Sequence, residues 1–143
     1  MNVNISHKGL TKIPKKYKDK IIDGSFNCDS NELTSLEGAP QEVGGYFYCH
    51  NNKLTSLEGA PQKVGGDFSC INNQLTSLEG APQEVGGNFA CYRNSNLPLS
   101  EILKYIIYSK IKGGINSDYN DEFLDKFNKA NKHEKIKLIF RSI

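Results

Sequence analysis

The chain has 143 residues, of which 37% are hydrophobic, and this is enough for one compact unit with a core. No charged-then-apolar leader opens it, and no apolar run approaches the roughly 18–20 residues that span a membrane. We therefore expect a cytoplasmic protein, of a bacterial cell or of a host cell, and exclude a membrane-embedded one.

Residues 1–22 are predicted to form an N-terminal capping turn for a repeated structure that begins at residue 23. Their apolar positions match those of the first full unit at a shift of 23, whereas Ile22 matches Val43 at a shift of 21. The turn therefore carries a two-residue insertion, around residues 14–18. Lys8 stands where each later unit has an asparagine, as expected for an end turn that is open to solvent.

Residues 23–98 consist of a 21-residue repeat. The eight residues Leu-Thr-Ser-Leu-Glu-Gly-Ala-Pro stand unchanged at 33–40, 54–61 and 75–82. A period of this length is typical of a solenoid, in which each unit buries its apolar face against its neighbours. Four further columns follow the same period: Phe26, Phe47, Phe68 and Phe89; Cys28, Cys49, Cys70 and Cys91; Asn31, Asn52, Asn73 and Asn94; and Ile22, Val43, Val64, Val85 and Ile106.

Each unit is predicted to contain one short strand and an irregular return. Phe-x-Cys has the two-residue period of a half-buried strand. The Leu, Leu, Pro and Val that follow are too broken by Gly and Pro for a helix, so the return should be extended or turn-like. The Asn amides should be buried and bonded to turn backbone. The Gly-Gly pairs at 44–45, 65–66 and 86–87 are expected to need positive φ.

The unit resembles the leucine-rich repeat family, whose general pattern is L-x-x-L-x-L-x-x-N-x-L. Phe47 and Cys49 take the strand leucine positions, Asn52 takes the asparagine position and Leu54 follows it. The short unit and the proline in its return are similar to the bacterial subclass, found in secreted effectors and in phage-encoded proteins. Over residues 1–98 the resemblance implies an α/β solenoid, a right-handed coil with short parallel strands on a concave face and a non-helical convex side.

The four cysteines invite a zinc or a disulfide interpretation, but their spacing argues against both. Zinc ligands converge on one point, usually from C-x₂₋₄-C pairs, whereas these cysteines recur once in each unit along a ladder. Parallel, in-register side chains also point the same way, which is poor disulfide geometry. We expect buried, reduced cysteines that act as small hydrophobes in a reducing cytosol, and no metal or other cofactor.

Residues 99–143 are predicted to form an α-helical C-terminal cap over the last turn, and the regular solenoid is expected to stop before them. The alternative is that this segment is an effector in its own right. The first helix is expected to end at Gly113-Gly114. The predicted helix starts are Ser100 for the first helix, Asp118 or Asn120 for the second, and Asn131 for the third.

Charge is distributed unevenly along the chain, although the formal net charge is only +2. Residues 1–22 carry +5, residues 23–98 carry −6 and residues 99–143 carry +3. The repeats therefore lack the continuous basic stripe that a phosphate backbone requires, and nucleic acid is not an expected partner.

Recognition is predicted to come from the strand positions that vary while the scaffold repeats. The residues that flank each Phe and Cys point to the opposite side of the strand layer and differ almost everywhere between copies. Drift at exposed positions is the alternative, but drift alone would rarely favour aromatic residues. The resulting amphipathic set has the composition of interfaces, and the candidate partner-binding residues are Tyr46, Tyr48, His50, Asp67, Ile71, Tyr92 and Arg93.

The favoured function is a non-enzymatic module that binds a partner protein through its concave face and inhibits or sequesters it. The three histidines are scattered, without an evident Asp and nucleophile at matching positions, and no P-loop or dinucleotide glycine pattern is present. The Asn-, Lys- and Ile-rich composition is typical of a low-GC genome, which makes a phage-encoded inhibitor of a host defence protein one hypothesis. The alternative is a scaffold protein that forms a homo-oligomer through its C-terminal helices.

Overall fold

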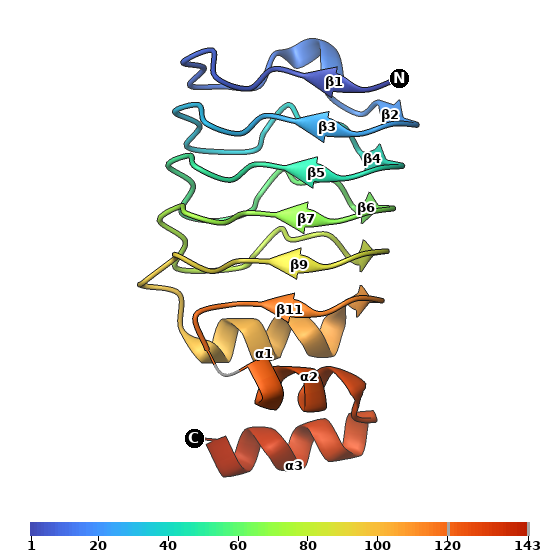
Figure 1. Ribbon diagram of the computed structural model, residues 1–143, viewed down its shortest axis with the longest axis vertical. Helices are drawn as coiled ribbons and strands as arrows, with labels where there is room; N and C mark the ends of the chain where they lie inside the picture. Colours follow the sequence, from blue (N-terminus) through green and yellow to red (C-terminus); the bar gives the residue numbers. More distant parts are fainter. Residues whose placement is uncertain (120, 143) are drawn as a thin grey trace.

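The computed structural model describes residues 1–119 and 121–142, and its chain winds into a solenoid with two parallel sheets (Figure 1). A six-stranded sheet has the order β1-β3-β5-β7-β9-β11 and a five-stranded sheet the order β10-β8-β6-β4-β2. The first contains β1 (Val3–Asn4), β3 (Phe26–Asn27), β5 (Phe47–Tyr48), β7 (Phe68–Ser69), β9 (Phe89–Ala90) and β11 (Ile115–Asn116). The second contains β2 (Ile21–Ile22), β4 (Glu42–Val43), β6 (Lys63–Val64), β8 (Glu84–Val85) and β10 (Lys110–Ile111).

The register confirms a parallel solenoid with a 21-residue period. Phe26 pairs with Phe47 and Phe47 with Phe68, so identical residues stack on successive turns. The first turn pairs Val3 with Phe26, two positions out of step, and the short 3₁₀ helix η1 (Lys15–Tyr17) lies within the predicted insertion. The extended return has more regularity than the sequence indicated, because its Val column forms the second sheet.

Stacked aromatic rings fill the centre of the solenoid. The four ladder phenylalanines are fully buried and nearly parallel, with ring centroids 5.2–5.5 Å apart. Tyr17 packs edge-on against Phe26 at one end, at 5.2 Å, and Tyr105 lies 4.7 Å from Phe89 at the other. The ladder thus ends against a tyrosine at each end, and both of these tyrosines are only partly buried.

The asparagine ladder is buried and hydrogen-bonded as predicted. Asn73 Nδ2 donates to the carbonyl oxygens of Cys49 and Cys70, each at 3.1 Å. Its Oδ1 accepts the Leu54 N–H at 3.0 Å. Each ladder amide therefore ties its own turn to the preceding one and satisfies backbone groups that the irregular return leaves unpaired.

The prediction that the Gly-Gly pairs adopt positive φ was wrong. The glycines with positive φ are Gly9, Gly38, Gly59 and Gly80. A Cβ atom on Gly65 would instead collide with the carbonyl oxygen of Gly44, and one on Gly86 with that of Gly65. These pairs are glycine because successive turns approach each other closely there, and not because of their backbone angles.

The sequence suggested that the regular solenoid stops before residue 99. The structure instead adds one more turn after that point. Ile111 pairs with Val85 and Ile115 with Phe89, so β10 and β11 complete one more turn, later in the chain than the regular period would place it. Helix α1 (Leu99–Tyr108) replaces the irregular return of this turn and takes up the extra length. Ile106, expected in the Val column, is instead buried within α1.

Three helices, α1, α2 (Asp121–Lys129) and α3 (Lys132–Ser142), cover the C-terminal end of the stack (Figure 1). The Ser100 cap was wrong, because Pro98 holds the N-cap position with extended backbone; α1 also ends at Tyr108, before the Gly pair. The Asn131 start is confirmed: its side chain accepts the Glu134 N–H, and Glu134 accepts the Asn131 N–H. Asn120 lies outside the described residues. Among those that are described, no helix has the length and apolar character to cross a membrane.

Candidate functional site

The outer face of the six-stranded sheet carries three aromatic side chains on one strand. Tyr46 precedes β5, Tyr48 lies in it and His50 follows it, so all three point away from buried Phe47 and Cys49. The rings of Tyr46 and Tyr48 are stacked, with centroids 4.0 Å apart and planes 18° apart. The His50 ring lies 5.5 Å from Tyr48 at 61°. The result is a continuous aromatic row along one turn.

His50 has a partner that was not predicted from the sequence. Its Nε2 lies 2.9 Å from Asp29 Oδ2, and Asp29 is mostly buried. His7 approaches the other carboxylate oxygen at 3.5 Å. The sequence did contain a signal for this contact, because Asp29 precedes His50 by one repeat period in the same column. The carboxylate holds the imidazole in place, as an Asp does for a catalytic histidine.

A nucleophile for such a dyad is not seen in the described part of the chain. No hydroxyl or thiol there is hydrogen-bonded to His50, and its Nδ1 is buried without a hydrogen-bond partner. Ser69 Oγ is likewise buried and unpartnered. The Asp29–His50 pair therefore orients an imidazole ring at the surface of the sheet.

The column that contains Tyr46 has a structural task in most turns. In four of its members a side-chain oxygen accepts a backbone N–H of the following turn, at 2.8–3.0 Å. These acceptors are Asn2, Ser25, Asp67 and Asn88, and their donors are Ser25, Tyr46, Asn88 and Gly114. Tyr46 is the exception, since a phenol ring replaces the short acceptor. Asp67, predicted only as a partner contact, also supports the scaffold.

The remaining candidates lie farther along the same sheet. Ile71 and Tyr92 follow β7 and β9 in the column of His50; Ile71 is half-buried and Tyr92 is 37% exposed. With strands about 4.8 Å apart, Tyr92 lies two strands, or roughly 10 Å, from His50. Arg93 sits at the corner after the strand with a φ of 57°, where Asn51 and Asn72 sit in earlier turns. We call Tyr46, Tyr48, His50, Ile71 and Tyr92 the tyrosine patch, and Arg93 borders it.

An acidic group lies close to the stacked tyrosines. Asp67 is opposite Tyr46 on the neighbouring strand, where its carbonyl oxygen accepts the Phe47 N–H at 2.9 Å. Partial burial raises the pKa of Tyr48, and the nearby Asp67 carboxylate and the Tyr46 phenol raise it further. The Tyr48 hydroxyl therefore stays protonated and can donate a hydrogen bond at neutral pH.

The cysteine ladder points into the core, away from this surface. All four thiols are free and buried, and Cys28, Cys49 and Cys70 each place Sγ 3.3–3.4 Å from a carbonyl oxygen of the next turn. Burial raises the pKa of every one of them, that of Cys91 to about 12. Thiolate is consequently scarce at neutral pH. Over residues 1–119 and 121–142, no group of three or more His, Cys, Asp or Glu side chains could hold a metal ion.

Comparison of the chain with protein-family models, with curated proteins and with solved structures finds no match. A proposal about function therefore depends on the geometry of the surface itself. In that geometry, a rigid ladder of strands carries one row of aromatic side chains that are not required to hold the strands together.

Proposed function

We propose that this chain is a small, non-enzymatic protein-binding module of the leucine-rich repeat type, which recognises its partner through the tyrosine patch. The observation that carries the proposal is Tyr46. Its column supplies backbone acceptors in four other turns, yet here a large aromatic ring stands in place of one. Tyr46 therefore lacks the side-chain acceptor that holds the next turn elsewhere in the column and presents an exposed ring instead. This replacement points to a role other than holding the turns together.

The composition and rigidity of the patch support the same proposal. Tyrosine is enriched among the residues that dominate binding energy, because it buries a large area and loses few rotatable bonds. The Tyr46 and Tyr48 rings are already stacked, and Asp29 already holds His50. Less conformational entropy is lost on binding when the contact residues are fixed beforehand. In our proposal the module inhibits or sequesters its partner by covering the partner's surface.

In its most specific form, the proposal is that this protein is encoded by a phage. The module would act in the cytoplasm of a bacterial host and occupy a surface of a host protein, such as a defence component. Its asparagine-, lysine- and isoleucine-rich composition supports this form.

Replacing both Tyr46 and Tyr48 by alanine is expected to weaken partner binding by roughly 30-fold or more, the effect of losing one interface hot spot. Partners would be captured from host lysate, identified by mass spectrometry and then titrated with the purified chain. The matched control replaces Ile21 of β2 and Ile136 of α3 by alanine; these residues are 71% and 44% exposed and lie outside the tyrosine patch. Equal binding by the two double variants, at unchanged thermal midpoints, would exclude the patch as the recognition surface.

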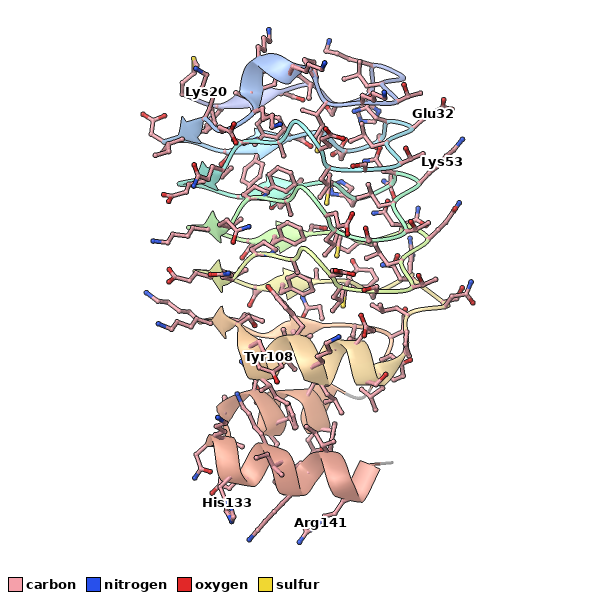
Figure 2. All side chains as sticks on the ribbon, turned by 180° about the vertical axis from the view of Figure 1, so that it is seen from behind. Lys20, Glu32, Lys53, Tyr108, His133 and Arg141 are labelled. Atoms are coloured by element: carbon pink, nitrogen blue, oxygen red, sulfur yellow. The ribbon has the colours of Figure 1, made fainter. Side chains whose placement is uncertain are left out.

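A second candidate function is self-association through the C-terminal helices. An apolar pocket of about 330 Å³ lies between α1 and α3, lined by Leu99, Leu103, Ile107 and Ile139 among others. Tyr108, also in its lining, projects from α1 (Figure 2). Under this alternative a concentration-dependent dimer would appear in sedimentation velocity, and Ile139→Lys would dissociate it. Deletion of residues 115–143 is a poorer test, since it removes β11 from the sheet.

A further inference from the structure

The tyrosine patch lies in the most acidic part of the chain. Residues 23–98 carry a net charge of −6, and two of their carboxylates, Asp29 and Asp67, adjoin the aromatic row. The same range has three basic residues. Lys53 is at the corner beside Glu32, at 3.8 Å (Figure 2), Lys63 belongs to β6 of the other sheet, and Arg93 sits at the corner after β9. The stacked tyrosines thus have acidic neighbours and no lysine or arginine on their own strand.

We propose that the tyrosine patch recognises an arginine side chain of the partner protein, whose guanidinium stacks on the Tyr46 ring and donates hydrogen bonds to the Asp67 carboxylate. This inference rests on the proposed function and specifies the chemistry of the partner. The partner is therefore expected to present a basic segment with at least one exposed arginine.

The geometry supplies both halves of such a site. One face of the Tyr46 ring lies against Tyr48 at 4.0 Å, and the side chain remains 36% exposed. A cation within about 6 Å of such a ring face is attracted to it, and arginine more often than lysine. Asp67 is opposite Tyr46 on the adjacent strand, and its Oδ1 already accepts the Asn88 N–H at 2.8 Å. That bond fixes the carboxylate, and Oδ2 is available to a new donor.

Arginine fits this arrangement better than other groups. A guanidinium is planar, so it can stack on a phenol ring and still direct N–H groups at a neighbouring carboxylate. A lysine ammonium can take the charge but cannot stack, and it is more strongly hydrated. An acidic partner segment would be repelled by Asp29, Asp67 and the net charge of the repeats.

The key variant is Asp67→Asn, because the scaffold itself shows that asparagine can do the structural part of the task. Asn88 occupies the next position of the same column, and its Oδ1 accepts the Gly114 N–H at 2.8 Å. Asp67→Asn should therefore keep the bond to the Asn88 N–H and remove only the charge. Glu79→Gln is the matched control, since it removes one charge from an exposed residue of the return segment.

The experiment uses the full chain with isotope-labelled tyrosine rings and three short peptides that differ only in carrying three arginines, three lysines or three glutamates. Binding would be followed by NMR at 0.15 M salt. We expect the arginine peptide to shift the Tyr46 and Tyr48 ring signals, to bind more tightly than the lysine peptide, and to lose at least fivefold in affinity with Asp67→Asn. Glu79→Gln should stay within twofold of the unmodified chain.

Three results would overturn the inference. They are equal affinity for the arginine and glutamate peptides, shifts confined to residues outside the tyrosine patch, and equal losses from Asp67→Asn and Glu79→Gln. The proposed function fails separately, if Tyr46→Ala with Tyr48→Ala leaves partner capture intact. Patch-dependent capture of a partner whose binding ignores Asp67→Asn would keep the binding function and reject arginine recognition.

Discussion

Phe68→Ala is expected to lower the free energy of unfolding by about 3–5 kcal/mol, the usual cost of removing a buried phenylalanine ring. Phe68 is fully buried and stacked between Phe47 at 5.5 Å and Phe89 at 5.2 Å. Sheet hydrogen bonds hold the strands that carry Phe47 and Phe89 in place. These two rings therefore cannot move in to fill the cavity that Phe68 leaves. The loss therefore combines lost burial with the cavity that remains.

Urea unfolding followed by far-UV circular dichroism would measure this effect. Tyr92→Ala, on the outer face, serves as the control and should change the unfolding free energy by no more than about 0.5 kcal/mol. Because the ladder is broken in its middle, the Phe68→Ala transition should also broaden, as the two halves of a repeat array lose their coupling. A loss no larger than that of the control would show that the ring stack is not what holds the turns together.

Asn73→Ala is expected to be equally severe, with a loss of about 3–5 kcal/mol, although it removes only a small polar group. Without the amide, the Leu54 N–H loses its acceptor, and the carbonyl oxygens of Cys49 and Cys70 each lose one of two side-chain donors, keeping those of Asn52 and Asn94. A buried polar group left unpaired costs about 1–3 kcal/mol, and each further hydrogen bond lost costs about 0.5–1.5 kcal/mol. The same unfolding measurement applies.

Two further variants separate hydrogen bonding from volume at this position. Asn73→Asp has nearly the same shape but presents a carboxylate oxygen to carbonyl oxygens, so at neutral pH it should destabilise at least as much as Asn73→Ala. Gln74→Ala alters the neighbouring exposed side chain and should cost no more than about 0.5 kcal/mol. Near-wild-type stability of Asn73→Asp would mean that the donors are dispensable and that the ladder acts through packing alone.

The repeated part of the fold could be predicted because the same physical requirement, burial or hydrogen bonding, recurs at each column of the repeat. Phe, Cys, Leu and Val are buried in each of the three full units, and the asparagines are tied to backbone as expected. Predictions that depended on contacts between turns were less successful. The Gly-Gly pairs were recognised as special, but the cause is the approach of the previous turn's carbonyl oxygen, which one unit viewed alone does not show.

The candidate surface was predicted in outline and changed in detail. Alternation along the strand was sufficient to place Tyr46, Tyr48 and His50 on one face. It did not reveal the contact between His50 and Asp29, nor the scaffold bond that Asp67 makes to the Asn88 N–H. Both contacts join residues one repeat period apart, so they follow from the register and from side-chain direction together.

By itself, the sequence determined the period, the burial of its apolar columns and the side of the strand on which the variable residues lie, because stacking copies of one unit leaves little freedom. Only the tertiary structure decided where the solenoid ends. Helix α1 interrupts the period at Leu99, yet Tyr105 packs on Phe89 and donates to the Pro82 carbonyl oxygen at 2.6 Å. The chain then returns at β10 and β11, which pair with β8 and β9 and so cover the sheet edges that the last regular turn would leave open.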